Sequence, residues 1–273
     1  MNILGIDASE QSCSVALKVN AHFFLRSKMA PRLHAELILP MVDELKQEAN
    51  IPLSSVDAFA VTIGPGAFTG VRIAMAFTQG LSWSLSKPVV GISTLKVLAY
   101  QGYLKFKIKR VVVLMDARMN QVYMAAYTMG DDGNVTCNIP EQVCDIAQAP
   151  FVLEEWLCNA RRNLDVDGLA VNGLEVDNWV AVGSGCRYLE EMQSRLEETH
   201  NRSGESQKKS LRLLSPNAVE SQFPCMAEHL AALAERDFLR GVFCSALDLE
   251  PLYLRNNVAV PSQSLSFSAI AAS

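Results

Sequence analysis

The chain has 273 residues, of which 49% are hydrophobic and 19% charged, and its formal net charge is −5. This is the composition of a packed globular protein, and the length allows two units of ordinary domain size. The negative net charge excludes a protein that binds nucleic acid through an overall positive charge, because such proteins carry clustered lysine and arginine.

Cysteine usage and the N-terminus indicate the compartment. The seven cysteines are scattered and form no C-x-x-C pair, which indicates buried thiols in a reducing compartment and neither a disulfide framework nor a zinc site. The start MNILGIDAS has no basic segment and no long apolar core. We therefore expect no signal peptide and no membrane association, but a cytoplasmic protein.

The first predicted elements are three strands, at residues 2–6, 15–19 and 21–27. The polar turn DASEQSCS joins the first two strands and contains Asp7 and Ser9. Such a turn can hold a phosphate or its metal, or it can be an ordinary hairpin turn, since both use the same residue types.

Two predicted helices have more apolar surface than one core contact needs. In the first, over 33–49, apolar residues cover well over half of the circumference, whereas a core-facing stripe needs only about 100°. The second, over 71–86, has no charged side, because Arg72 is the only ionisable residue between 58 and 86. It is shorter than the ~20 residues that span a bilayer. We expect both helices to contribute to one contact surface.

A glycine-rich turn, GPGAFTG, enters the second of these helices after a buried strand predicted at 58–63. Glycine permits backbone angles and close approaches that a side chain would prevent, and Thr69 is expected to cap the helix. Pro88 ends the helix.

The second half of the chain repeats the alternation of strands and helices. An exposed basic connection at 105–110 marks the expected boundary between two lobes. The predicted elements are a helix at 94–103, strands at 110–116 and 122–127, strand plus loop at 136–149, a helix at 151–160, a strand at 180–182, a helix to 198, a mobile loop at 199–210, a strand at 211–214, a helix start at 215–218, a helix at 225–240, an extended segment at 251–257 and an unstructured tail at 258–273.

Two glycine turns are candidate anion sites. GPGAFTG lacks the lysine of a Walker loop and the spacing of a dinucleotide fingerprint, and GSGCR has the same strand–turn–helix form. Each could bind an anion at a helix N-terminus or simply permit a tight turn. With the first polar turn, the possible nucleotide-binding or anion-binding residues are Asp7, Ser9, Gly64, Gly66, Gly183 and Gly185.

Metal and catalytic constellations are poorly represented. The four histidines form no pair at helical spacing, and His34 with Glu36 supplies too few ligands for catalytic zinc. We predict no metal site. Asp116 and Arg118 follow a strand, where catalytic groups often lie, but a salt bridge that pins their turn is the preferred interpretation.

Seven segments, in order, resemble one family: MNILGIDAS, SVAL, HAELILPMVDEL, VTIGPGAFTGVRIAMAFTQGL, GISTLKVLA, LMDARMNQVY and PLYLRNNVA. They are similar to the TsaB (YeaZ) family, the bacterial partners of TsaD in making threonylcarbamoyladenosine in tRNA. The match covers most of 1–128, thins through 130–214 and returns at 215–258. The 199–210 loop and the tail after Val260 depart from it.

The resemblance implies a two-lobed actin-like or Hsp70-like fold with ribonuclease H-like lobes. The lobes would comprise 1–103, with about 216–257 packing back on it, and 104–215. TsaD would contain the active site, which includes a metal ion bound by the two histidines of an H-x-x-x-H motif. That pair is absent here, because Ile38 stands four residues after His34. The chain would be a non-catalytic scaffold that keeps TsaD active while TsaD modifies the adenosine beside the anticodon.

The resemblance also implies partners. Family members form homodimers, or heterodimers with TsaD, through two helices that correspond here to 33–49 and 71–86. TsaE and ATP or ADP would join near that interface, with no cofactor required by the chain itself, and tRNA would bind only through the complex. The predicted contact residues are His34, Leu37, Ile38, Met41, Leu45, Arg72, Met75, Ala76, Gln79 and Trp83.

Two alternatives stay open from the residues. One is a nucleotide-binding, actin-like small-molecule kinase, which would need a metal-binding carboxylate such as Asp7 in its cleft. The other is a metallopeptidase-like protein, although the chain offers no residues that support peptide hydrolysis.

Overall fold

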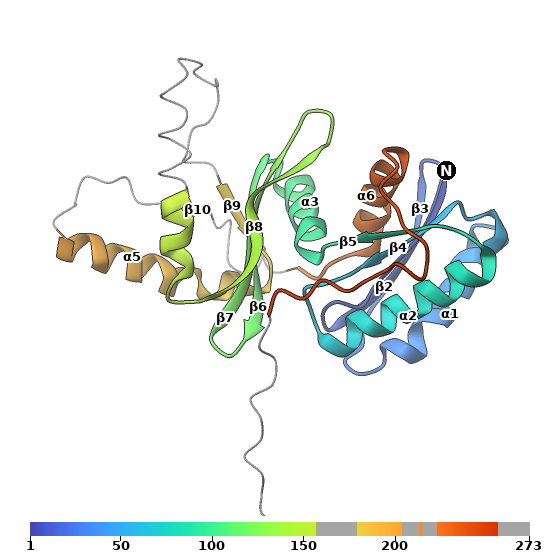
Figure 1. The fold of residues 1–273 in the computed structure, drawn as a ribbon, viewed down its shortest axis with the longest axis horizontal. Coiled ribbons are helices and arrows are strands. Elements are labelled where there is room, and N and C mark those ends of the chain that lie inside the picture. Colours follow the sequence, from blue (N-terminus) through green and yellow to red (C-terminus); the bar gives the residue numbers. More distant parts are fainter. Residues whose placement is uncertain (157–178, 204–212, 215–222, 256–273) are drawn as a thin grey trace, which may run out of the picture.

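The computed structural model describes residues 1–156, 179–203, 213–214 and 223–255. Its core contains two five-stranded sheets, ordered β3-β2-β1-β4-β5 and β10-β9-β6-β7-β8. In each sheet the first three strands in chain order pair antiparallel, and the next two extend the sheet in parallel from the first strand. This confirms the predicted two-lobed α/β fold of the actin-like type (Figure 1).

The first sheet places its most apolar strands at the centre. Its strands are β1 (Asn2–Asp7), β2 (Ser12–Val19), β3 (His22–Met29), β4 (Ala58–Thr62) and β5 (Val89–Ile92). The central strand β4 is buried throughout, whereas the edge strand β3 is largely exposed. A continuous apolar run therefore marks a strand covered on both faces, as the sequence predicted.

The helices of the first sheet lie on both of its faces. Helices α1 (His34–Glu48) and α2 (Phe68–Leu85) pack side by side on one face, and α6 (Ala227–Leu239) packs on the other (Figure 1). The short 3-10 turn η1 (Leu53–Ser55) leads into β4. α2 starts before the predicted residue 71 and has no side-chain cap. The prediction that Thr69 caps it is therefore wrong.

The second sheet consists of β6 (Arg110–Arg118), β7 (Gln121–Met129), β8 (Val135–Asp145), β9 (Trp179–Val182) and β10 (Leu213–Leu214). Residues 149–156 form a helix. The 3-10 turn η2 (Ser184–Tyr188) and α5 (Leu189–Ser203) follow β9. Because α5 continues to Ser203, the predicted loop is wrong over 199–203.

A shared core lies between the two sheets. α3 (Thr94–Phe106) packs on β6, β7 and β9 and also on α6. Its buried residues join those of α6 in one apolar cluster, for example Leu98 with Leu230 and Val113. Thus α3 begins before the boundary predicted at residue 104, extends just past it and packs on the second sheet. The division into two domains itself stays a prediction.

The segment 243–255, which we call the strap, crosses from the first sheet to the second (Figure 1). Cys244 exchanges backbone hydrogen bonds of 2.9 Å with Val89 on the edge strand β5. Farther along, the Leu252 N–H donates to the Ile63 carbonyl over 2.8 Å. Arg255 then reaches the second sheet, where its Nη2 donates to the Ala117 carbonyl over 3.1 Å. The strap therefore ties the two lobes together.

Several predictions fall wholly or partly outside the described residues: the end of the helix at 151–160, the loop over 204–210, the strand over 211–212, the helix start at 215–218, the extended segment over 256–257 and the tail at 258–273. Across the described ranges, no helix is long and apolar enough to cross a membrane.

Candidate functional site

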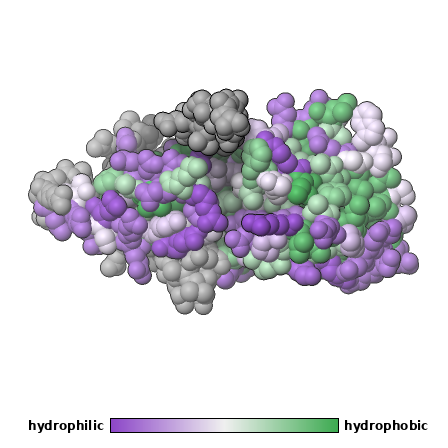
Figure 2. Space-filling model, turned by 90° about the horizontal axis from the view of Figure 1, so that it is seen from below, coloured by the Kyte–Doolittle hydropathy of each residue, from purple (hydrophilic) through white to green (hydrophobic). Residues whose placement is uncertain are grey.

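The outer faces of α1 and α2 form an exposed apolar surface, which we call the docking face. On α2, the side chains of Phe68 and Trp83 are 60% and 65% exposed, and the small residues Ala76 and Gly80 lie exposed between them. On α1, Leu39 is 45% exposed. Figure 2 views the molecule from this side and shows hydrophobic residues gathered over the half that holds the first sheet.

Several predicted contact residues lie inside the lobe and not on this face. Ile38 and Leu45 are fully buried, and Met41 and Met75 are 7% and 5% exposed. All four belong to the core cluster between the helices and the sheet, which also contains Leu4. The expectation that such residues are surface anchors is wrong for the single chain, because they complete its own core.

Other predicted contact residues are accessible or serve the strap. Leu37 is half-buried, whereas Ala76 and Trp83 are exposed. Gln79 Nε2 donates to the Ala246 carbonyl of the strap over 2.9 Å. Arg72 lies against the rings of Phe68 and Tyr253. The contact of these residues with a partner stays a prediction.

His34 starts α1 but does not point to the docking face. It is 6% exposed, and its Nε2 atom is buried without a hydrogen-bond partner among the described residues. It lines the cavity between the lobes that is described below.

The turn between β1 and β2 holds two carboxyl groups, one completely buried and one partly buried. Asp7 is completely buried, and its Oδ1 accepts a 2.6 Å hydrogen bond from the Thr62 hydroxyl. Burial raises the pKa of Asp7, although hydrogen bonds from Thr62 and Ser9 oppose the rise. Glu10 lies nearby, and burial together with the charge of Asp7 raises its pKa to about 7. The prediction from the sequence named this turn but missed Glu10.

The first glycine turn is closed against the β1–β2 turn. A Cβ atom at Gly66 would lie 2.3 Å from the Ser9 carbonyl oxygen, and one at Gly70 would lie 2.0 Å from that of Ala8. The Ala67 N–H also donates to the Ser9 carbonyl over 2.7 Å. These glycines are therefore explained by close backbone packing, whereas binding of an anion by Ser9, Gly64 and Gly66 stays a prediction.

The second glycine turn has the same structural role in the other lobe. Gly183 has φ = 103°, and a Cβ atom there would lie 2.4 Å from the Leu114 carbonyl oxygen of β6. Gly185 approaches the same residue, with 2.9 Å between its added Cβ and the Leu114 carbonyl carbon. Each lobe thus uses glycine where the turn before a helix crosses a central strand. Anion binding by Gly183 and Gly185 also stays a prediction.

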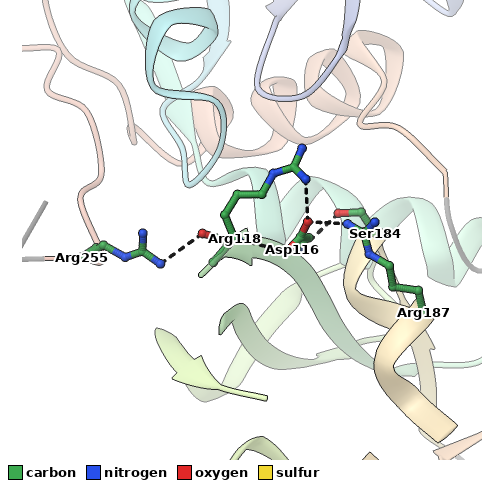
Figure 3. Close-up of polar contacts among 6 residues, drawn as sticks. Asp116, Arg118, Ser184, Arg187 and Arg255 are labelled. Atoms are coloured by element: carbon green, nitrogen blue, oxygen red, sulfur yellow. Dashed lines mark hydrogen bonds and ion pairs between the residues drawn. The ribbon is translucent and has the colours of Figure 1, made fainter. Parts of the chain in front are cut away.

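A cluster of arginines surrounds Asp116 at the end of β6 (Figure 3). Arg118 Nη1 lies 3.4 Å from Asp116 Oδ2, and Arg187 donates to the same oxygen. The Arg118 N–H donates to Asp116 Oδ1 over 3.0 Å, and the Asp116 N–H donates to Ser184 Oγ over 3.2 Å. The predicted salt bridge between Asp116 and Arg118 is confirmed. Arg187, distant in sequence, was missed.

A cavity of about 700 Å³ opens between the lobes. Its first-lobe wall includes Ser9, Glu10 and His34, and its second-lobe wall includes Asp116 and Arg187. This volume is within the range of small-molecule sites, ~300–1,000 Å³. Asp7 lies behind this wall, so its carboxyl group is not part of the cavity lining. In the described part of the chain, no group of three or more His, Cys, Asp and Glu side chains could hold a metal ion.

Comparison with known proteins gives consistent matches over nearly the whole chain. Residues 25–259 match the family model described as TsaD: tRNA N6-adenosine threonylcarbamoyltransferase. The chain is 30% identical over 258 residues to the tRNA threonylcarbamoyladenosine biosynthesis protein TsaB of Haemophilus influenzae, which covers 94% of this chain and 95% of the relative. It is 33% identical over 263 residues to TsaB of Escherichia coli, which covers 95% and 96%.

Among solved structures, the chain is similar to YeaZ from Pseudomonas aeruginosa, with 32% identity and a TM-score of 0.70 over 93% of this chain and 99% of that chain. Another structure from the same organism, described as an uncharacterized protein with similarity to peptidase YEAZ, has 32% identity and a TM-score of 0.72, with the same coverage.

Proposed function

Since the chain belongs to the TsaB family, within the wider family whose model is described as TsaD, we propose that it is an adaptor for threonylcarbamoyladenosine formation in tRNA. It docks the transferase TsaD through the outer faces of α1 and α2. The catalytic groups come from TsaD, and this chain holds TsaD in its active conformation.

The observation that carries this proposal is the docking face itself. Phe68 and Trp83 are large apolar side chains that stay exposed on a helix with no charged residue after Arg72. Between them, Ala76 and Gly80 are four residues apart, so they present a small-residue surface against which another helix can approach closely. Exposed apolar surface of this kind marks a protein contact.

The burial of Asp7 supports a non-catalytic role. A phosphoryl-transfer enzyme needs a carboxylate that can reach a metal ion and a nucleotide. Here the Asp7 carboxyl group is completely buried and accepts a hydrogen bond from Thr62, and its pKa is raised. The residue best placed by sequence for kinase chemistry is therefore buried outside the lining of the cavity.

Substitution of Trp83 tests the proposal. Full burial of one large apolar side chain contributes roughly 1.5–3 kcal/mol, so Trp83→Glu is expected to weaken binding to TsaD by about tenfold to a hundredfold. Leu239→Glu is the matched control, because Leu239 is 75% exposed but ends α6 on the opposite face of the first sheet. Both affinities are measured by titration calorimetry with purified TsaD. Equal affinity for the two variants would contradict docking through α2.

We further propose that the same docking face pairs two copies of the chain when TsaD is absent, and that TsaE and a nucleotide join the heterodimer. Sedimentation velocity tests the first part: Trp83→Glu is expected to shift the chain to monomer, whereas Leu239→Glu leaves its association state unchanged.

A further inference from the structure

A row of residues runs from α2 along the strap to the second lobe, where Arg118 and Arg187 line the cavity. We call it the arginine row. Its members come from four separate segments and are Arg72, Tyr253, Arg255, Met119, Arg118 and Arg187.

The members of the row are linked partly by side-chain contacts and partly along the chain. The Arg72 guanidinium carbon lies 5.1 Å from the centroid of the Tyr253 ring. Two residues later on the strap, Arg255 Nη1 lies 3.6 Å from Met119 Sδ. Met119 follows Arg118, which shares the Asp116 carboxylate with Arg187 (Figure 3). Arginines far apart in sequence are therefore connected through the strap and the turn after β6.

These side chains are fixed in place but accessible. Arg118 and Arg187 are 73% and 44% exposed as side chains, while Asp116 is only 7% exposed. Arg118, Met119 and Asn120 all have positive φ, of 62°, 52° and 60°, so the turn holds the exposed Met119 outward in a left-handed backbone conformation. Tyr253 is 51% exposed.

The row carries excess positive charge on a chain whose net charge is −5. Two of its four arginines, Arg118 and Arg187, pair with the Asp116 carboxylate. Glu10 is a second carboxyl group in the lining of the same cavity. Two further carboxyl groups lie at the margin of the row. Asp145 accepts a hydrogen bond from the Gln121 side chain, and Glu250 is exposed earlier on the strap. One carboxylate shared by two guanidinium groups orients both without neutralising them.

We propose that the arginine row binds the sugar–phosphate backbone of the RNA substrate and stacks one unpaired base on Tyr253. Guanidinium groups pair with phosphate through two parallel hydrogen bonds. Aromatic side chains between such cations are typical of surfaces that bind unpaired nucleotides. The proposal rests on the proposed function, because the docked complex supplies the RNA substrate. Arg72 contacts Phe68 of the docking face, so in the complex with TsaD the RNA is expected to meet the row at the strap and in the second lobe.

The test uses the complex of this chain with TsaD and a fluorescein-labelled tRNA. The dissociation constant is measured by anisotropy over a series of potassium chloride concentrations. Arg118→Gln removes one phosphate contact, so the slope of log Kd against log salt is expected to fall by about 1. Tyr253→Leu removes stacking without removing charge, so it weakens binding about fivefold or more at an unchanged slope.

Arg195→Gln is the matched control for charge. Arg195 is 48% exposed as a side chain and lies on α5, outside the row. Arg118→Gln and Arg195→Gln with the same slope and affinity as the native chain would overturn the proposal. The proposal would also be overturned if the row variants lost affinity for TsaD, measured in the same samples, and kept their affinity for RNA. The row would then be a protein contact. Failure of Trp83→Glu to weaken TsaD binding would instead contradict the docking proposal alone.

Discussion

At the scale of single residues, burial determines the behaviour of the carboxyl groups in the β1–β2 turn. Asp7 is completely buried beside Thr62, and Glu10 is close enough for the charge of Asp7 to raise its pKa further. The Cys225 N–H and the Ser184 hydroxyl favour the charged form of Glu10, but desolvation outweighs them. Two desolvated carboxyl groups in one turn therefore make the stability of this chain depend on pH.

Glu10→Gln is expected to reduce that pH dependence. The pKa of Glu10 is raised from 4.5 to about 7 on folding, so between these pH values the folded chain binds more protons than the unfolded chain. The free energy of unfolding then falls as pH rises from about 4.5 to about 7, by roughly 3 kcal/mol for this group. Below pH about 4.5, Glu10 does not lower the free energy of unfolding. Above pH about 7, it lowers the free energy of unfolding by the full amount.

Urea denaturation at pH 5 and at pH 8 measures the effect. From pH 5 to pH 8, the Glu10→Gln variant is expected to lose less stability than the native chain. Glu190 is an exposed residue on α5, so Glu190→Gln is expected to behave like the native chain. An unchanged pH dependence in Glu10→Gln would show that Glu10 is not desolvated.

Two glycines of the same segment are expected to respond in opposite directions to alanine. Gly66→Ala would place a methyl group 2.3 Å from the Ser9 carbonyl oxygen, and the overpacking should cost about 1–3 kcal/mol or more. Gly80→Ala meets no atom within 4 Å inside α2, and alanine should stabilise the helix by roughly 0.5–1 kcal/mol. Thermal unfolding of both variants checks the signs, and destabilisation of similar size in both would contradict this assignment.

At the scale of elements, α1 and α2 each serve two surfaces. Their inner residues, such as Ile38 and Val71, complete the core against the first sheet. Their outer residues, such as Leu39 and Trp83, remain exposed. A helix that is apolar on both sides can stabilise its own lobe and bind a partner at the same time.

Aspartate at two positions of α1 separates these roles. Met41→Asp buries a charge in the core and is expected to destabilise the first lobe by roughly 3–5 kcal/mol, because Met41 is 7% exposed. Leu39→Asp changes a side chain that is 45% exposed, so stability should change by less than about 1 kcal/mol while TsaD binding weakens. Urea denaturation and calorimetry with TsaD measure the two effects. A folded Met41→Asp variant of native stability would refute the burial of this side of α1.

At the scale of the whole molecule, the strap and the α3–α6 core join the lobes. Cys244 covers part of the edge strand β5, and Leu249 is 6% exposed in the first-lobe core. Arg255 completes the connection on the second sheet. The C-terminal segment therefore stabilises a lobe made of the earliest residues of the chain.

Deletion of residues 243–273 is expected to lower the midpoint of thermal unfolding by several degrees and to promote aggregation, since it uncovers an edge strand and removes Leu249 from the core. Deletion of 256–273 alone removes none of the strap contacts described above and serves as the control. Differential scanning calorimetry and light scattering measure both. Equal midpoints for the two deletions would mean that the strap adds no stability.

The amino-acid sequence by itself determined the succession of strands and helices and the family. Central strands such as β4 are continuous apolar runs between turn residues, which local pattern identifies. The motifs GPGAFTGVRIA and DARMNQVY carried the family resemblance. Two exposed residues of the docking face, Ala76 and Trp83, were also named from the sequence.

Only the tertiary structure decided which side of α1 faces inward, and which distant residues meet. Apolar residues cover so much of α1 that periodicity does not fix its orientation, so Met41 and Leu39 look alike in the sequence although one is buried and the other exposed. The pairing of Asp116 with Arg187 and the contact of Arg255 with β6 depend on sheet order and chain crossing. Local propensity carries no information on these contacts, because their free energy arises only once the lobes have folded together.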